Sequence, residues 1–217
     1  GHSIGFFAGG ALKRLDLGGG APQSLAPATN GSGGTWNANG VIVFAPSLTS
    51  PLMRVSAAGG AAMAVTTLGP QQFGHYHPQF LPDGRRILFT VGGAPDAWGI
   101  YLGELDGSSP ARLVSDVSSG AYAPTGWLLW VRAGALMAQR LDVGRTALTG
   151  EPVTLADGMT IDGSGRSAVS MATTGLVHVS SCPDPEIRID SKPANQQNGC
   201  HENNDRPARG SRAPSET

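Results

Sequence analysis

The sequence predicts an all-β protein, a β-propeller built from four-stranded blades. A glycine-led turn followed by an apolar strand recurs at nearly regular intervals, and a second strand type recurs in step with it. The composition agrees, because Gly accounts for 32 and Pro for 16 of the 217 residues while only 14 % are charged. Such a chain, without a long helical pattern, is typical of many short strands joined by turns.

The clearest copy of the turn lies within residues 80–91, where Pro82, Asp83 and Gly84 join two apolar segments. Proline fixes φ for the second position of a turn, aspartate can bond its own backbone, and glycine accepts a positive φ. The segment therefore predicts a β-hairpin.

Five glycines lead strands of this kind, and their positions define a period. They are Gly1, Gly40, Gly84, Gly126 and Gly175, separated by 39, 44, 42 and 49 residues. The strands after them are expected at 3–8, 41–45, 87–91, 127–131 and 176–180. A period in the low forties is that of a propeller blade.

A second landmark follows each of the first four strands: a strand with partly alternating polarity that ends in a polar turn. These strands are expected at 12–16, 52–56, 100–106 and 136–142, with a short fourth strand after each at 23–25, 63–66, 111–114 and 152–155. Two landmarks in step support one repeating unit.

The repeat assigns residues 1–180 to the propeller and gives about three whole blades, at 34–68, 77–115 and 120–156. Strands two to four of another blade are expected at 3–26, and strands one and two of a last blade at 167–180. Because a propeller blade buries its sheet against two neighbours, we expect an incomplete ring with exposed apolar ends, including Phe6, Phe7 and Val177. Self-association through the open blade edges is expected to follow.

Residues 181–217 form a polar tail that contains no Leu, Val, Phe, Trp, Tyr or Met. Such a segment cannot bury enough apolar surface to offset its ordering entropy, so we expect it to be disordered. Cys182, Cys200 and His201 lie in this tail, where metal binding, a disulfide and unpaired thiols all stay open. Since the repeat begins and stops within a blade, the chain is expected to be a fragment.

Charge and hydropathy narrow the range of partners. The net charge of −1 gives no electrostatic reason to expect nucleic acid or an anionic membrane surface. No run approaches the ~18 apolar residues that a membrane span requires.

The turn at Phe80–Arg85, with its period, resembles the blades of TolB-type, WD-repeat-like β-propellers, which carry such a turn before strand two. More narrowly, residues 36–46, 76–89, 100–105, 121–124 and 136–139 resemble the propeller attached to bacterial Ser/Thr protein kinases. The aspartate of the turn is missing at 37–40, 123–126 and 172–175.

The resemblance implies a non-catalytic module that binds a protein or small ligand within a larger kinase-like or TolB-like protein. It implies no cofactor, and it favours a periplasmic or extracytoplasmic location. No kinase motif is present, so any kinase or peptidase activity would reside in another domain. The alternative is the propeller domain of a prolyl-oligopeptidase-like serine peptidase.

Three motifs carry weaker functional hypotheses. Ser3, within Gly1-His2-Ser3-Ile4-Gly5, matches a nucleophile elbow, although it is expected only to open a strand. His75 and His77 alternate and could form a metal pair or line the propeller mouth, and no third ligand has suitable spacing. Residues 157–165 have the Gly and Asp of a calcium loop without its spacing, which favours a plain interblade loop. The residues expected at a binding mouth are Trp36, His75, Tyr76, His77 and Tyr122.

Overall fold

The computed structural model of the protein describes residues 2–167, 169–171, 176–179 and 186–188. Every regular element among them is a strand, and the strands form five antiparallel sheets in chain order. The prediction of a β-propeller with four-stranded blades is confirmed.

Three sheets have four strands each, as expected. The first consists of β4 (Gly34–Trp36), β5 (Val41–Phe44), β6 (Met53–Ser56) and β7 (Met63–Ala64). The second consists of β8 (Gln72–Phe80), β9 (Arg86–Gly93), β10 (Gly99–Glu104) and β11 (Ala111–Val114). The third consists of β12 (Ala121–Ala123), β13 (Trp127–Arg132), β14 (Ala135–Asp142) and β15 (Ala147–Ala156).

Two three-stranded sheets lie at the ends of the array. The N-terminal one contains β1 (Ser3–Ala8), β2 (Ala11–Asp16) and β3 (Gln23–Pro27). The C-terminal one contains β16 (Val169–Met171), β17 (Leu176–Val179) and β18 (Glu186–Arg188). The strand β18 was not predicted, since it lies in the tail expected to be disordered. The rest of that tail, with Cys182, Cys200 and His201, lies outside the described residues.

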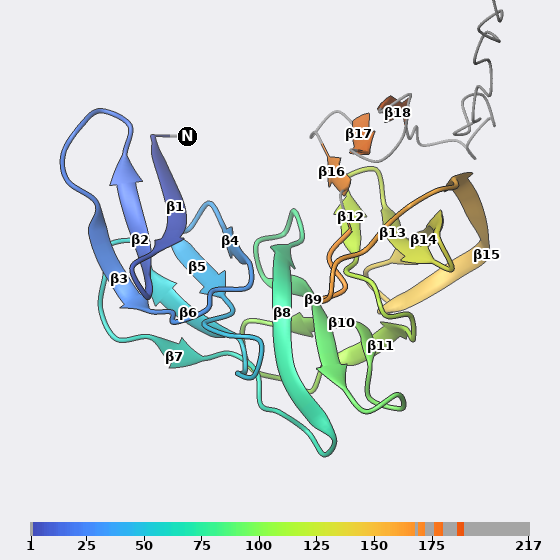
Figure 1. Ribbon diagram of the computed structural model, residues 1–217, viewed down its shortest axis with the longest axis horizontal. Coiled ribbons are helices and arrows are strands. Elements are labelled where there is room, and N and C mark those ends of the chain that lie inside the picture. Colours follow the sequence, from blue (N-terminus) through green and yellow to red (C-terminus); the bar gives the residue numbers. More distant parts are fainter. Residues whose placement is uncertain (1, 168, 172–175, 180–185, 189–217) are drawn as a thin grey trace, which may run out of the picture.

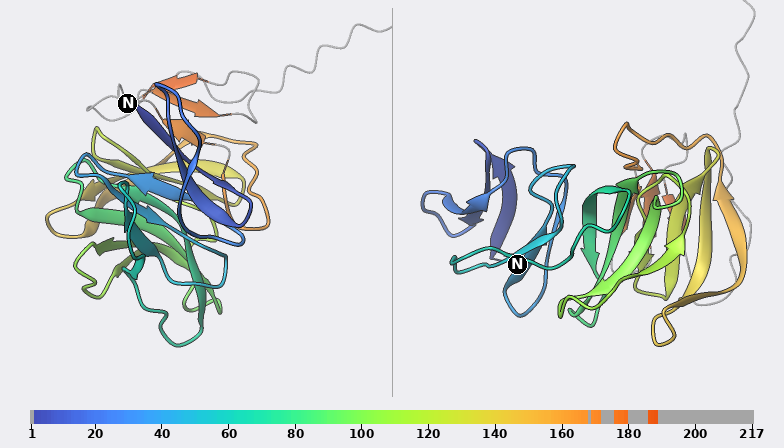
Figure 2. Two further views of the ribbon diagram at one scale, coloured as in Figure 1. Left: turned by 90° about the vertical axis from the view of Figure 1, so that its left-hand side faces the viewer. Right: turned by 90° about the horizontal axis from the view of Figure 1, so that it is seen from below.

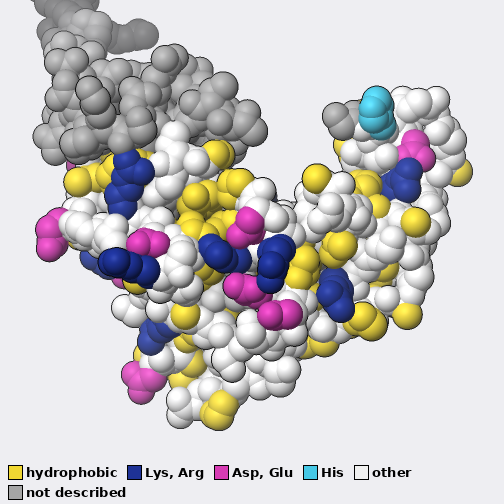
Figure 3. Space-filling view, turned by 180° about the vertical axis from the view of Figure 1, so that it is seen from behind, with side chains coloured by type: hydrophobic (Ala, Val, Ile, Leu, Met, Phe, Trp, Pro, Cys, Tyr) yellow, Lys and Arg dark blue, Asp and Glu magenta, His cyan; other side chains and the backbone are white. Residues whose placement is uncertain are grey.

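The five sheets follow one another around an arc (Figure 1). The innermost strands β4, β8, β12 and β16 border a central opening, and β1 and the β16–β18 sheet lie at the two ends of the arc. Figure 2 shows the sheets stacked face to face, and Figure 3 shows from behind the hollow between the ends. Among the described strands, β1 pairs only with β2, and β16 only with β17.

The hydrophobic core is divided into layers between neighbouring sheets. Leu12 and Leu25 of the β1–β3 sheet pack with Ile42 and Phe44 of β5 in one layer. The same arrangement joins β4–β7 to β8–β11, and β8–β11 to β12–β15. In the last layer Val169 of β16 packs against the β12–β15 sheet. Each large side chain buried in such a layer contributes about 1.5–3 kcal/mol.

Arginines add a polar tie between neighbouring sheets. The guanidinium of Arg14 donates to the Ala57 carbonyl at 2.9 Å, and that of Arg54 to the Leu105 carbonyl at 3.3 Å. Arg14 lies on β2, the middle strand of its sheet, and Arg54 lies on β6; both reach the turn after the third strand of the next sheet. Arg86 of β9 reaches the Val143 carbonyl in the following sheet at 2.7 Å.

Candidate functional site

The candidate site lies at the central opening, where a bulge in β8 meets the loop that leads to β16. The pairing of β8 with β9 shifts between Tyr76 and Gln79, and His77 adopts a φ of 53° at this point. Its N–H donates to the Ser32 carbonyl at 2.9 Å. A Cβ at Gly33 would lie 2.9 Å from the His77 Cα, so this close approach requires glycine.

The bulge separates the two histidines that the sequence placed on one face of a strand. His75 is buried, with Nε2 2.9 Å from Gln72 Oε1 and Nδ1 2.7 Å from Thr66 Oγ1. Because an amide oxygen only accepts, Nε2 of His75 carries the proton and Nδ1 accepts from the threonine. Burial lowers the pKa of His75 to about 4, which keeps the ring neutral.

The loop at 157–167 is organised by Asp162. Its Oδ1 accepts from the Ser164 and Arg166 N–H groups at 2.8 and 3.0 Å, and from the Ser164 hydroxyl at 2.6 Å. The hydrogen bond from the Ser164 side chain is the main cause that lowers the pKa of Asp162. The loop therefore holds a fixed carboxylate, as the spacing of an Asx turn implies.

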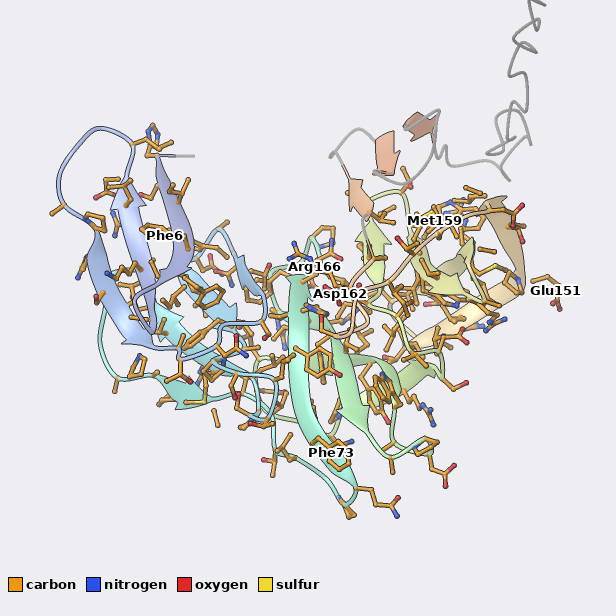
Figure 4. All side chains as sticks on the ribbon, viewed as in Figure 1. Phe6, Phe73, Glu151, Met159, Asp162 and Arg166 are labelled. Carbon is orange, nitrogen blue, oxygen red and sulfur yellow. The ribbon has the colours of Figure 1, made fainter. Side chains whose placement is uncertain are left out.

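The loop at 157–167 is anchored on the loop before β12. The Ser119 N–H donates to the Gly165 carbonyl at 2.6 Å, and the Ser167 N–H donates to the Ser119 hydroxyl at 3.2 Å. A Cβ at Gly165 would overlap the Val117 carbonyl, so glycine is needed for this approach. Both anchors bring Asp162 and Arg166 to the side of β8 (Figure 4).

One contact joins the loop to the bulge: Ser164 Oγ lies 3.4 Å from His77 Nε2. The Ser164 hydroxyl donates its hydrogen bond to Asp162, so its oxygen can only accept from His77. The proton of the neutral His77 ring is therefore on Nε2, and Nδ1 is an unprotonated acceptor. Nδ1 is buried and has no partner among the described residues. Burial, with the nearby Arg166 charge, lowers the pKa of His77 to about 4, although Asp162 opposes the shift.

The hydrogen-bond order in this cluster differs from that of a nucleophilic triad. In a triad the histidine accepts the serine proton and the carboxylate holds the other side of the ring. Here the carboxylate of Asp162 accepts the hydrogen bond from the Ser164 hydroxyl, and the histidine donates a hydrogen bond to the serine oxygen. The cluster can hold a polar group, but its serine is not activated for attack.

The exposed residues of the two joined loops include one cation, two aliphatic side chains and the Asp162 carboxylate. Arg166 is exposed, and in the described part of the chain its guanidinium makes no hydrogen bond or ion pair. Val117 and Ile161 are 48 % and 40 % exposed. We call His77, Ser164, Arg166, Val117 and Ile161 the mouth cluster. Its chemistry suits a ligand that combines an anionic group with an apolar part.

The remaining residues expected at the mouth have different surroundings. Tyr76 is buried between the β4–β7 and β8–β11 sheets, and its ring lies 5.2 Å from that of His77. Tyr122 is buried in the next layer, while Trp36 packs on the layer that joins β4–β7 to β1–β3. Of the five expected residues, His77 is the one with a hydrogen bond to the loop at 157–167 in the described part of the chain.

The other sequence hypotheses are located as follows. Ser3 is the first residue of β1, and its hydroxyl bonds to Asp16. Residues 157–165 form the interblade loop described above. In the described part of the chain, no three His, Cys, Asp or Glu side chains are placed to hold a metal ion. Nor does that part contain a helix that is long and apolar enough to cross a membrane.

Sequence reasoning missed Ser164 and Arg166 as site residues. Their signal was the Asp-Gly-Ser-Gly-Arg order at 162–166, which predicts an Asx turn that presents the next polar side chains. The meeting of this turn with His77, 87 residues away in sequence, could not be inferred from either segment alone.

Comparisons with known proteins agree with the fold. No family model matches the chain, and no curated protein matches it. Solved structures do, among them puromycin hydrolase with a TM-score of 0.57 and 17 % identity, covering 86 % of this chain and 35 % of that one. Oligogalacturonate lyase in complex with manganese gives 0.54 and 15 %, covering 85 % and 57 %.

TolB from Acinetobacter baumannii gives a TM-score of 0.52 at 18 % identity, covering 78 % of this chain and 46 % of that one. The chain thus spans about half the length of this TolB structure. At these identities the likeness concerns the fold, and it agrees with the sheet order and the packing described above. The chain therefore has the β-propeller fold of TolB-like structures.

Proposed function

We propose that the protein is a non-catalytic β-propeller segment that binds a protein or small ligand at its central opening. The observation that carries this proposal is the mouth cluster, where Arg166 and Ile161 are exposed on the loop at 157–167 and Val117 is exposed on the loop whose carbonyl approaches Gly165. An exposed guanidinium can bind a carboxylate or phosphate in two parallel hydrogen bonds. Apolar neighbours would add affinity by excluding water from the bound ligand.

Two features support a binding role over a catalytic one. The hydroxyl of Ser164 donates its hydrogen bond to Asp162. The low pKa of His77 keeps its ring neutral, and its Nε2 donates to the serine oxygen and therefore does not accept the serine proton. Ser3 has Asp16 as its side-chain partner, and no histidine bonds to it among the described residues. Activation of either serine would require an effective general base, whereas the carboxylates that accept their hydrogen bonds, Asp162 and Asp16, have lowered pKa values and are therefore weaker bases.

We further propose that the segment belongs to a larger sensor protein, kinase-like or TolB-like, in which the propeller lies outside the cytoplasm. The support is the resemblance of the turn motif and the blade-like repeat. A kinase domain upstream in the parent reading frame would agree with the kinase-like version.

Binding is tested by titrating the isotope-labelled chain with short peptides that have a free C-terminal carboxylate, with amidated peptides as the control. We expect amide shifts at Ser164 and Arg166 with the free peptides. Arg166→Gln should weaken binding, whereas Arg145→Gln, a matched change at a side chain 82 % exposed in the β14–β15 turn, should not. Equal shifts with amidated peptides, or none with either, would contradict a mouth that binds anionic groups.

A second candidate is the propeller domain of a serine peptidase. It is supported by the likeness to puromycin hydrolase, of which this chain covers 35 %. On this hypothesis the central opening admits peptides to a catalytic domain. An α/β-hydrolase domain downstream in the parent frame, with its own nucleophile elbow and histidine, would favour it over the sensor.

A further inference from the structure

A second charge lies beside the mouth cluster: the carboxylate of Asp162, which is exposed in the same loop as Arg166. Asp162 Oδ1 accepts three hydrogen bonds, two from Ser164 and one from the Arg166 N–H. The other oxygen, Oδ2, has no hydrogen-bond partner in the described part of the chain. One oxygen therefore holds the carboxylate in place, and the other can accept from a ligand.

The charges of Asp162 and Arg166 lie in one turn of the loop but do not pair with each other. The main-chain nitrogen of Arg166 lies 3.0 Å from Asp162 Oδ1, so the arginine side chain begins next to the carboxylate (Figure 4). Even so, the guanidinium forms no ion pair with Asp162 or with any other carboxylate of the described residues. An exposed cation and an exposed anion are thus both available to one ligand.

The ring of His77 lies near both charges and neutralises neither. Burial is the main cause that lowers the pKa of His77 to about 4; the Arg166 charge lowers it further, and the Asp162 charge opposes the shift. These opposite effects place both charges within electrostatic range of one ring. Because that ring is neutral near pH 7, it does not balance the carboxylate of Asp162.

We propose that the ligand of the mouth cluster is a small zwitterion with an apolar side chain, a chemistry that free amino acids and short peptides share. This inference rests on the function proposed above, which requires only an anionic group at Arg166. The group added here is an ammonium, which donates to Asp162 Oδ2 while the ligand carboxylate accepts from the guanidinium. The exposed aliphatic side chains of Val117 and Ile161 suit the apolar part of such a ligand.

The first test compares ligands on the unaltered chain, by titration of the isotope-labelled protein with leucine and with N-acetylleucine. Acetylation removes the ammonium and keeps the carboxylate, so we expect it to weaken binding about fivefold. Leucylleucine and its N-acetyl derivative repeat the comparison at peptide length, and the length that binds more tightly tells a free amino acid from a peptide. Amide shifts at Ser164 and Arg166 report the binding.

The outcomes separate this inference from the function on which it rests. Weaker binding after acetylation, at either length, supports a zwitterion. Equal binding of the acetylated and free ligands at both lengths would overturn it and would leave the anion site at Arg166 in place. No shift with any of the four ligands would overturn both the zwitterion and the anion site.

The second test removes the negative charge. Asp162→Asn keeps an oxygen that can accept from the loop N–H groups, so it should weaken the binding of leucine about fivefold without weakening that of N-acetylleucine. Asp106→Asn is the matched control, because Asp106-Gly107-Ser108 repeats the order of residues 162–164. Its Oδ1 accepts from the Ser108 N–H at 2.9 Å in the turn between β10 and β11. This variant should bind both ligands as the unaltered chain does.

The anchor of the loop shows whether Asp162→Asn keeps its shape, because the Ser119 N–H donates to the Gly165 carbonyl. Unchanged amide signals at both residues indicate an intact loop. If they change, the comparison of free and acetylated ligands on the unaltered chain decides alone. With the anchor intact, an equal loss for leucine and N-acetylleucine, or an equal loss in Asp106→Asn, would overturn the proposal.

Discussion

Gln79 offers a direct measure of how strongly the innermost strands hold one another. Its side-chain amide pairs with both main-chain groups of Tyr122 in the next sheet. Nε2 donates to the Tyr122 carbonyl at 3.1 Å, and Oε1 accepts from the Tyr122 N–H at 2.7 Å. Because β12 pairs on one side only, this amide takes the place of a neighbouring strand at that residue.

Gln79→Leu keeps much of the side-chain volume and removes both hydrogen bonds. Each buried group left without a partner costs about 1–3 kcal/mol. Since these groups are partly buried, we expect a loss of about 2–4 kcal/mol from the free energy of unfolding. For a domain of this size, that corresponds to a fall of roughly 5–15 °C in Tm.

Urea denaturation followed by circular dichroism gives the free energy, and a thermal scan gives the Tm. Gln139→Leu is the matched control, because Gln139 makes one exposed bond to the Gly150 carbonyl within its own hairpin. We expect it to cost less than about 1 kcal/mol. A loss in Gln79→Leu no larger than in the control would refute the idea that this amide ties the two sheets.

Four more predictions follow from single contacts. Arg86→Ala removes the bond to the next sheet and the ion pairs to Asp83 and Glu104, and should cost about 1–3 kcal/mol in urea denaturation. His75, with a pKa of about 4 when folded and 6.5 otherwise, binds protons mainly in the unfolded state between these values. Stability should therefore be full above pH 6.5 and fall as the pH drops toward 4, by about 3 kcal/mol from this residue, and His75→Gln should flatten the dependence. Gly74→Ala places a Cβ against the Leu48 carbonyl and should lower the Tm, whereas Gly18→Ala, with open space around it, should not. Finally, hydrolysis of activated esters should stay at background in both the unaltered chain and Ser3→Ala; a burst lost in that variant would contradict the binding role.

The blade pattern was predictable because each blade repeats the same local chemistry. The glycine-led turns at Gly40, Gly84 and Gly126 all have positive φ, as the turn requires. The strands after them were placed within one or two residues. Strand β15 is longer than predicted, because Ala147–Ala156 pairs with nearly the whole of β14. The length of β15 depends on its pairing with β14, which cannot be read from the residues of β15 themselves.

Two local expectations were wrong for the same physical reason. His75 and His77 would share a face in a regular strand, but the bulge of β8 gives them separate partners. Phe7 was expected to be exposed at an open end, yet it packs against the layer shared with β4–β7. Phe6, its neighbour on the other face, is partly exposed, and the side chain of Val177 lies outside the described residues. In each case strand register, set by tertiary pairing, decided the outcome.

The loop at 157–167 has a consequence for the order in which the chain folds. In a repeat array most sheets touch only their neighbours, so each can fold once the adjacent one is in place. The contact of Ser164 with His77 skips the β12–β15 sheet and joins residues 87 apart in sequence. Bringing Ser164 to His77 closes a long chain loop, and the entropic cost of this closure is low only after β8 and the β12–β15 sheet have formed. The mouth cluster should therefore assemble in a late kinetic phase, after the strands that frame it.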